Sequence, residues 1–194
     1  TALLRAVWYP TTVATVSWNC RQVIARYMND TAESLEGIGF KLHDFGARGA
    51  TSEEAAAIGG AAHLVSFQGT DNISAIMATR RYYDAYMAGF SIPAAEHSTI
   101  TSWGRENEKA AYANMLEQNS APGKLVAVVS DSYDLWNAIE NIWGDELKAQ
   151  VEATGGTLVV RPDSGDPVTI VTETIERLMR KFGCEINSKG YRVL

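Results

Sequence analysis

The sequence predicts an α/β fold in which parallel strands are covered by helices. Short apolar runs alternate with longer amphipathic stretches, and residues typical of helix N-termini precede several of these stretches. The expected strands are Phe40–Phe45, Leu64–Gln68, Phe90–Pro93, Leu125–Ser130 and Leu158–Arg161. The expected helices are residues 11–30, 52–60, 72–86, 99–118, 133–150 and 167–181.

Each expected element has a local reason. The strands are predicted from short apolar runs, which are typical of strands buried between helices. The starts of several helices are predicted from N-cap residues, whose side-chain oxygens accept hydrogen bonds from the unpaired N–H groups of the first turn. These caps are Thr51 or Ser52, Asp71, Ser98, Asp131 or Ser132, and Asp166, which Pro167 follows at the first helical position.

Length and composition are those of a globular domain. The 194 residues are 46% hydrophobic and 21% charged, enough for a substantial core. Only about five strand–helix units are visible, whereas a closed eightfold barrel takes about 250 residues. The chain starts at Thr1 without an initiator Met, and a further strand begins near Tyr191. We therefore expect one α/β domain or part of one, within a longer protein.

Charge and cysteine content exclude some classes. A net charge of -6 disfavours a nucleic-acid-binding protein. Cys20 and Cys184 lie far apart and are expected to be free thiols in a reducing compartment. No apolar segment approaches the roughly 20 residues that span a bilayer, and no leader pattern precedes residue 20. The sequence predicts a cytoplasmic protein without membrane partners.

Charged side chains follow the expected strands. In parallel α/β folds, ligands bind beyond the carboxyl ends of the strands. Capping is an equally good explanation for some of the acids, but not for the cations, because a cation at a helix N-terminus opposes the helix dipole. The residues at these ends are Asp44, Phe45 and Arg48, then Thr70 and Asp71, Glu96 and His97, Asp131, and finally Arg161 and Asp163.

These residue types suit a phosphorylated or pyrophosphorylated substrate. One arginine guanidinium can bind two phosphate oxygens at once. Carboxylates hold Mg²⁺, which neutralises phosphate charge. The chain has no P-loop, no dinucleotide-binding glycine pattern and no Cys/His metal spacing. His97 is open to three interpretations: nucleophile, acid/base or structural histidine.

Five motifs, in order, resemble the central motifs of the nicotinamide phosphoribosyltransferase family. They are His43–Gly49, Gly69–Asp71, Ser91–Thr101, Val129–Asp134 and Arg161–Gly165, with further matches at Trp8–Thr15 and Asn187–Tyr191. The resemblance implies a (β/α) barrel-like domain of the type II phosphoribosyltransferase kind. Residues 1–194 would be its central part, incomplete at both flanks.

The resemblance also implies an activity. The family transfers a phosphoribosyl group from phosphoribosyl pyrophosphate to nicotinamide in NAD salvage, with Mg²⁺ as cofactor and ATP as co-substrate. Its active site is shared across a homodimer. By analogy, Phe45 stacks on the pyridine ring, Asp71 accepts a hydrogen bond from the carboxamide, and Ser91 lines the substrate site. Arg48 binds phosphate oxygens, and Arg161 lies beside the base and phosphates. Asp163 holds the ribose or the metal.

The resemblance assigns His97 to the histidine that ATP phosphorylates during turnover. Asp131, Glu96 and Asp163 are then candidates to orient its imidazole, and Asp131 and Asp163 are candidates to bind Mg²⁺. Which acid pairs with His97 stays open. Asp71 favours an amide and repels a carboxylate, although it also suits the N-cap of the helix that starts at Asn72.

Two positions depart from the family pattern. Ala127 stands where a serine that supports the amide-reading aspartate is expected, and Phe40 replaces a tyrosine of the ligand tunnel. The alternatives to a nicotinamide enzyme are a relative specific for nicotinate or another pyridine, and a noncatalytic fragment or interaction protein with the same fold.

Overall fold

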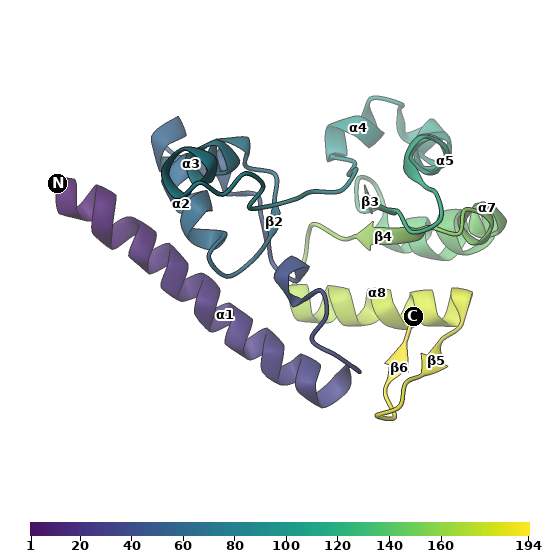
Figure 1. Cartoon of the computed structure of the whole chain (residues 1–194). Coiled ribbons are helices and arrows are strands. Elements are labelled where there is room, and N and C mark those ends of the chain that lie inside the picture. Colours follow the sequence, from purple (N-terminus) through teal and green to yellow (C-terminus); the bar gives the residue numbers. More distant parts are fainter. The chain divides into compact units, whose positions relative to one another are not determined.

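The structure is a computed structural model that describes residues Thr1–Leu194. The chain divides into two compact units. Unit 1 consists of Thr1–Ser91 and Asn187–Tyr191, and unit 2 of Ile92–Ile186 and Arg192–Leu194. Each unit is a mixture of helices and short strands (Figure 1).

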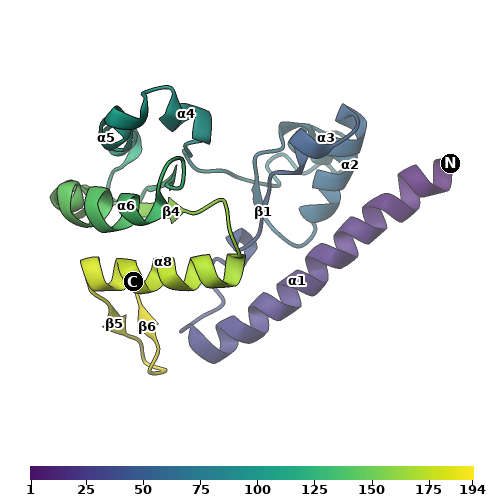
Figure 2. The same cartoon turned by 180° about the vertical axis from the view of Figure 1, so that it is seen from behind.

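Unit 1 contains three longer helices and one parallel strand pair. Its elements are a π-helical turn at Leu4–Trp8, α1 at Tyr9–Thr31, 3₁₀ turns at Ile38–Phe40 and Gly46–Gly49, β1 at His43–Asp44, α2 at Glu53–His63, β2 at Gly69–Thr70 and α3 at Ile73–Tyr83. Helix α2 packs on α1 and α3 (Figure 2). Strand β1 runs parallel to β2 with His43 opposite Gly69, and Phe90 forms a parallel bridge to Gly69.

Local sequence explains why α2 and α3 form and why they approach so closely. The Ser52 side chain accepts a hydrogen bond from the Ala55 N–H at 3.1 Å, which starts α2. At Gly60, a Cβ would lie 2.5 Å from the Cβ of Ala75 on α3. Only glycine permits this approach, which brings the first turn of α3 and its N-cap residue, Asn72, against α2.

Unit 2 is built on the parallel pair β3–β4. Its elements are α4 at His97–Thr101, a 3₁₀ turn at Arg105–Asn107, α5 at Glu108–Asn119, β3 at Leu125–Val129, α6 at Leu135–Asn137, a π-helix at Ala138–Glu146, α7 at Lys148–Ala153, β4 at Thr157–Arg161, α8 at Pro167–Phe182, β5 at Glu185–Ile186 and β6 at Arg192–Val193. Strands β3 and β4 pair from Leu125 opposite Thr157 to Val129 opposite Arg161. Ala94 adds a parallel bridge to Ala127, and β5 pairs antiparallel with β6.

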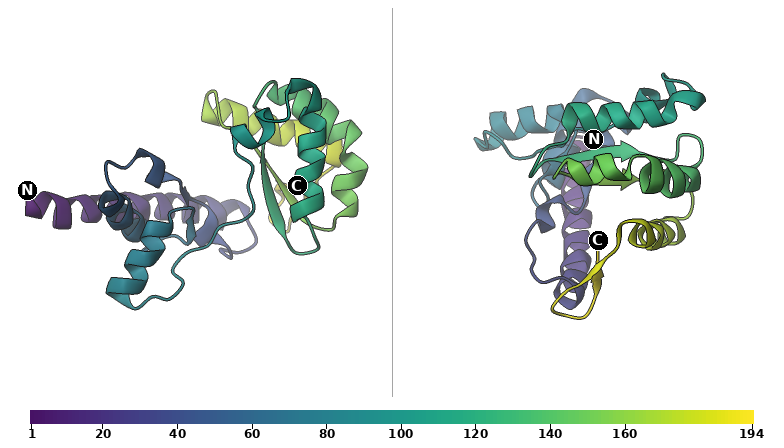
Figure 3. Two further views of the ribbon diagram at one scale, coloured as in Figure 1. Left: turned by 90° about the horizontal axis from the view of Figure 1, so that it is seen from above. Right: turned by 90° about the vertical axis from the view of Figure 1, so that its right-hand side faces the viewer.

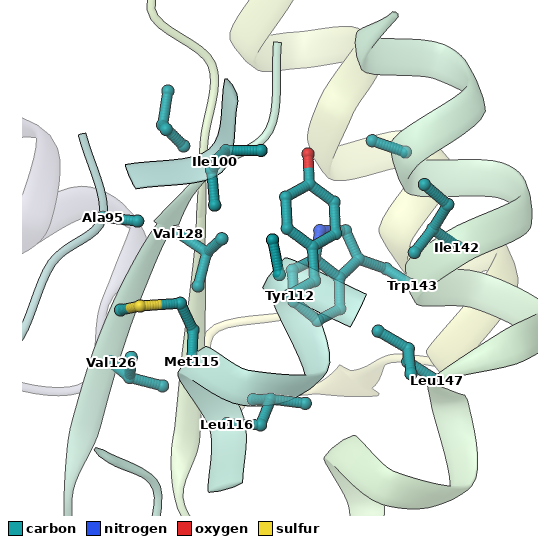
Figure 4. Close-up of a cluster of buried hydrophobic side chains, with 13 residues drawn as sticks. Ala95, Ile100, Tyr112, Met115, Leu116, Val126, Val128, Ile142, Trp143 and Leu147 are labelled. Carbon is teal, nitrogen blue, oxygen red and sulfur yellow. The ribbon is translucent and has the colours of Figure 1, made fainter. Parts of the chain in front are cut away.

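The hydrophobic core of unit 2 lies between β3, α5 and the π-helix (Figure 4). Val126, Val128 and Val129 of β3 are fully buried. The rings of Tyr112 and Trp143 stack with centroids 4.6 Å apart. Helix α5 runs beside β3 (Figure 3). This packing fixes the carboxyl end of β3, where Asp131 follows.

The structure confirms two of the predicted strands and shortens or removes the others. Strands β3 and β4 match the predictions at Leu125–Ser130 and Leu158–Arg161. The strand predicted at Phe40–Phe45 is only β1, and Phe90–Pro93 is reduced to the bridge at Phe90. The prediction at Leu64–Gln68 is wrong, because the backbone N–H of Leu64 donates to Gly60 and continues α2.

The predicted helices exist, with changed boundaries and caps. The single helix expected at residues 99–118 is divided at Gly104, whose φ of +83° no helix accommodates. The helix expected at 133–150 is three helical segments from Leu135 to Ala153, and Asp134 caps it instead of Asp131 or Ser132. Asp166 caps α8, as predicted, by accepting from the Thr169 N–H.

No closed barrel is present in residues 1–194; the parallel strands form two separate pairs. The described helices include none that is both long and apolar enough to cross a membrane. Cys20 and Cys184 are free thiols.

Candidate active site in two clusters

One cluster of predicted site residues lies in unit 1, at the carboxyl ends of β1 and β2. We call it the Asp71 cluster, and its members are His43, Phe45, Arg48, Asp71 and Ser91. The Asp71 carboxylate Oδ1 accepts a hydrogen bond from His43 Nε2 at 2.9 Å and another from the Ser91 hydroxyl. Both donors bind the same oxygen of the carboxylate.

Asp71 is not a helix cap. The Asn72 side chain, which is buried, caps α3 by accepting a hydrogen bond from the Ala75 N–H at 3.1 Å. The Asp71 side chain is 37% exposed, and its backbone N–H donates to the Asp44 carbonyl at 3.0 Å. The capping alternative for Asp71 is therefore wrong, and its carboxylate is held at the rim of the strand pair.

The surroundings of Asp71 favour its ionised form. Burial raises the pKa of Asp71, but hydrogen bonds from Ser91 and His43 and the charges of His43 and Arg48 outweigh it, so the net pKa lies below the ordinary value. An ionised carboxylate only accepts hydrogen bonds, and His43 must therefore carry a proton on Nε2.

Phe45 presents an aromatic surface beside this carboxylate. Its side chain is 40% exposed. The His43 ring lies 4.7 Å from it, and the Arg48 guanidinium lies 5.6 Å from the ring centroid. An aromatic face, a carboxylate and a guanidinium thus occur in one cluster, which suits a flat polar ring that carries a hydrogen-bond donor.

The neighbouring acid, Asp44, has a structural role. Its Oδ1 accepts from the Gly46 N–H at 2.7 Å, and its Oδ2 accepts from the Thr70 hydroxyl at 3.1 Å and from the Asn72 amide at 3.3 Å. Both oxygens are used to hold the loop after β1 against the loop after β2. Phe45 and Asp71, which flank this contact, are positioned by it.

A second cluster lies in unit 2, beyond the carboxyl ends of β3 and β4. We call it the His97 cluster, and its members are Glu96, His97, Asp131, Arg161, Asp163 and Ser164. Val129, the last residue of β3, lies opposite Arg161, the last residue of β4, so Asp131 and Asp163, each two residues further along, follow the strands at the same edge of the pair. The register of the strand pair therefore assembles the cluster.

Asp131 is the acid that pairs with His97. The side chain of Asp131 is only 4% exposed, and its Oδ1 lies 3.0 Å from His97 Nε2. Its Oδ2 accepts from the Asp163 N–H at 2.8 Å and from the Ser164 hydroxyl at 2.6 Å. Burial raises the pKa of Asp131, but these hydrogen bonds and the His97 charge outweigh it, and the net pKa is lowered.

His97 is held in a defined orientation with one ring nitrogen accessible. Because the Asp131 carboxylate only accepts hydrogen bonds, Nε2 carries the proton and a neutral ring keeps its lone pair on Nδ1. The Nδ1 atom lies 3.7 Å from Asp163 Oδ2, and the His97 side chain is 43% exposed. Such a ring can act as a nucleophile towards a ligand that approaches from solvent.

Arg161 spans the cluster and is partly unsatisfied. Its Nη2 donates to the Ala95 carbonyl at 3.0 Å, and its Nη1 lies 3.3 Å from Asp163 Oδ1. Its buried Nε has no hydrogen-bond partner. The side chain is 21% exposed, so the guanidinium is a largely desolvated cation at the strand ends, suited to an anionic or aromatic ligand.

Glu96 is mainly a helix cap. It forms a capping box with Thr99 at the start of α4, and its own N–H donates to the Thr99 hydroxyl at 3.2 Å. Its carboxylate lies 3.8 Å from Arg161. Glu96, not Ser98, therefore caps α4, and it is not the acid that orients His97.

The acids of the His97 cluster fit a metal ion only in part. Both oxygens of Asp131 accept hydrogen bonds from the protein and its side chain is only 4% exposed, so it is the less accessible of the two candidate ligands for Mg²⁺. Asp163 is 46% exposed and is the acid of the two that a cation can reach more readily. No group of three or more His, Cys, Asp and Glu side chains is arranged to hold a metal ion.

No role is predicted from the sequence for His43 and Ser164, which both contact a site aspartate in the structure. The signal for His43 is strand register: it lies opposite Gly69, so Asp71, two residues beyond Gly69, projects from the same face. For Ser164 the signal is weaker, because its bond to Asp131 depends on the turn after β4. Of the two departures, Ala127 is buried in β3, and Phe40 is half exposed with its ring 6.2 Å from that of Phe90.

Known proteins resemble this chain over nearly its whole length. The nicotinamide phosphoribosyltransferase of Xanthomonas campestris pv. campestris (strain 8004) is 56% identical over 193 residues, which are 99% of this chain and 41% of that protein. Those of Mycoplasma pneumoniae (strain ATCC 29342 / M129 / Subtype 1) and Acinetobacter baylyi (strain ATCC 33305 / BD413 / ADP1) are 34% and 32% identical over all of this chain, which covers 43% and 42% of them.

The chain thus spans about two fifths of the length of these relatives. The sequence profile described as the nicotinate phosphoribosyltransferase (NAPRTase) family matches residues 40–194, which include both clusters. This chain belongs to the nicotinate phosphoribosyltransferase (NAPRTase) family.

Proposed function

We propose that the protein containing this chain is a nicotinamide phosphoribosyltransferase of NAD salvage. It joins nicotinamide to the ribose carbon of phosphoribosyl pyrophosphate and releases pyrophosphate. The observation that carries the choice of base is the ionised Asp71 carboxylate, held on one oxygen by His43 and Ser91. The three relatives described above carry this enzyme's name.

The Asp71 cluster supplies the base-binding contacts. Phe45 stacks on the pyridine ring, and Asp71 Oδ2 accepts a hydrogen bond from the carboxamide NH₂. Nicotinic acid presents a carboxylate at this place, which has no proton to donate and is repelled by Asp71. Ser91 keeps Asp71 in place. The same carboxylate therefore attracts the amide and excludes the acid.

Phosphate and ribose contacts come from three residues. Arg48 binds phosphate oxygens, and Arg161, whose side chain is 21% exposed, lies beside the base and phosphates. Asp163 accepts hydrogen bonds from ribose hydroxyls. As pyrophosphate leaves, positive charge develops on the ribose, and a carboxylate near it stabilises that charge.

Mg²⁺ is proposed as the cofactor, bound mainly by substrate oxygens. Magnesium sites in phosphate enzymes commonly use one or two carboxylates together with the phosphates. Of the two candidate ligands, Asp163 is 46% exposed and Asp131, which is hydrogen-bonded to His97, is 4% exposed, so Asp163 is the more accessible to the metal. When bound, the metal neutralises charge on the leaving pyrophosphate.

ATP is proposed as a co-substrate that phosphorylates His97. Asp131 holds Nε2–H at 3.0 Å and leaves the Nδ1 lone pair for attack on the terminal phosphorus of ATP. The N–P bond forms as the bond to the ADP oxygen breaks, and water later hydrolyses the phosphohistidine. Arg161 offsets part of the Asp163 charge that faces this nitrogen.

The complete protein is proposed to be a cytoplasmic homodimer with a barrel-like type II phosphoribosyltransferase domain. Residues 1–194 would form the central part of that domain. The partner subunit would complete the active site. The alternatives are a relative that uses nicotinate or another pyridine, and a protein that has the fold without activity.

One comparison separates these alternatives. The full-length protein is incubated with phosphoribosyl pyrophosphate, Mg²⁺ and either nicotinamide or nicotinic acid, with and without ATP, and each mononucleotide is measured. We expect kcat/KM for nicotinamide to exceed that for nicotinic acid by at least about a hundredfold. Equal or greater use of the acid would refute the assignment of the base, and no product from either would favour the noncatalytic alternative.

A further inference from the structure

We infer that His43 is a positioning residue that sets the preference for the amide over the acid, acting through Asp71. This inference rests on the proposed function and deepens it. His43 touches both elements of the proposed base site: its Nε2 lies 2.9 Å from Asp71 Oδ1, and its ring lies 4.7 Å from that of Phe45.

The hydrogen bond from His43 decides which carboxylate oxygen faces the base. Nε2–H and the Ser91 hydroxyl both donate to Oδ1. An oxygen that accepts two protein hydrogen bonds is a poor acceptor for a third, and the carboxylate cannot rotate without losing both. These two bonds fix the orientation of the Asp71 side chain, so that in the proposed complex the carboxamide meets an oriented acceptor.

The contact with Phe45 links this acceptor to the stacking surface. The ring planes of His43 and Phe45 are tilted by 37°, and the His43 side chain is only 25% exposed. Movement of His43 would shift the aromatic surface and release the carboxylate together. His43 thus fixes the distance between the plane on which the ring stacks and the oxygen that reads its substituent.

The backbone is built to accommodate the His43 ring. Gly69 lies directly opposite His43 in the β1–β2 pair. A Cβ at position 69 would lie 2.7 Å from His43 Nδ1, closer than the two atoms can pack. The absence of a side chain at Gly69 therefore leaves the place in which the imidazole reaches Asp71. This is a second feature, independent of the hydrogen bond, that points to the ring's position.

The test uses the full-length protein and the ratio of kcat/KM for nicotinamide to that for nicotinic acid. His43→Phe keeps a ring against Phe45 but has no N–H for Asp71, and we expect the ratio to fall at least about tenfold. His43→Gln restores an N–H donor and should recover most of the ratio. Lys41→Gln, an exposed position on the same segment, is the matched control and should leave the ratio unchanged.

A second variant moves the ring without changing its chemistry. Gly69→Ala places a methyl group against Nδ1 and should lower the same ratio. The KM for phosphoribosyl pyrophosphate should change less than twofold in each variant that folds, whereas a general structural defect would raise it. If His43→Phe does not fold, Gly69→Ala decides by the same criterion.

The outcomes separate this inference from the function on which it rests. A wild-type protein that does not prefer nicotinamide overturns the proposed function and the role of His43 with it. A wild-type protein that prefers nicotinamide, together with a His43→Phe ratio within twofold of it, overturns the role of His43 alone. A lowered ratio that Gln fails to restore also contradicts it, because the donor would then not be the cause.

Discussion

At the residue scale, Asp131 collects the largest set of hydrogen bonds in the His97 cluster. Its two oxygens accept from Ser164, from the Asp163 backbone and from His97, and its side chain is almost fully buried. A buried carboxylate is costly unless such donors satisfy it. Asp131 therefore stabilises the loop after β4 as well as the His97 ring.

The lowered pKa of Asp131 gives a pH prediction. A carboxyl whose pKa is lower in the folded than in the unfolded state stabilises the fold above its unfolded pKa of about 3.9, and loses this effect as the pH falls through its folded pKa. Asp131→Asn should lower the unfolding free energy of the 194-residue chain at pH 7 by about 1–3 kcal/mol. In urea denaturation, this difference should shrink as the pH is lowered from about 5 to 3; a constant difference would contradict the assignment.

His97→Ala gives a functional prediction for the full-length protein. Loss of the nucleophilic ring should abolish the dependence of turnover on ATP and the hydrolysis of ATP, while basal phosphoribosyl transfer persists. Nicotinamide mononucleotide and ADP are measured together in the same reaction. Ser98→Ala, at the next residue, is the control and should keep the coupling. An ATP dependence that survives in His97→Ala would eliminate the phosphohistidine.

At the element scale, β3 and α8 were predictable because their signals are local. The run Leu125–Val129 is long and apolar, and Asp166-Pro167 combines a cap with a first-turn proline. The two-residue strands β1 and β2 have no such run, and their position depends on pairing with each other and on hydrogen bonds of Asp44. Such contacts join residues far apart in sequence, which propensity alone does not reveal.

Helix caps and site contacts also differ in how far the local sequence predicts them. Asp71 and Asp131 have the side chain of a cap, but Asn72 and Asp134 perform that role. The residue at which a helix begins decides which side chain meets the free N–H groups of its first turn. The sequence alone does not locate that residue to within about one to three positions. The site residues are predictable as a set because they follow strands, whereas the pairing of His97 with Asp131 depends on the bridge between Ala94 and Ala127, which brings the start of α4 beside β3.

The cap of α8 can be tested directly. Asp166 accepts from the Thr169 N–H at 3.0 Å, so Asp166→Ala should lower the unfolding free energy by about 1 kcal/mol. Ser98→Ala should change it by less than about 0.5 kcal/mol, because Glu96 caps α4 instead. Both are measured by urea denaturation of the 194-residue chain. Equal effects of the two variants would show that the caps are wrongly assigned.

At the scale of the whole molecule, each unit carries one chemically distinct cluster. Unit 1 holds the aromatic ring and the carboxylate proposed to bind the base, and unit 2 holds the histidine proposed to react with ATP and the Asp131 carboxylate that orients it. The core of unit 2 supports its cluster through β3. The integrity of this core should therefore matter for the stability of unit 2.

Trp143 tests this dependence. It is fully buried and stacks on Tyr112, and its indole N–H donates to the Ser130 hydroxyl at 3.1 Å, next to Asp131. Trp143→Ala should cost about 3–5 kcal/mol of unfolding free energy. Trp103→Ala removes the same side chain from a site where it is 42% exposed and should cost less than about 1 kcal/mol. Similar losses in denaturant titrations would contradict the placement of the core.

The central claim is that the Asp71 carboxylate selects the amide, and the most direct measurement is substrate preference in the full-length Asp71→Asn variant. Asparagine removes the charge and supplies an N–H that a carboxylate can accept. We predict that kcat/KM for nicotinamide falls at least about tenfold while kcat/KM for nicotinic acid rises. Unchanged values for both substrates would contradict the account.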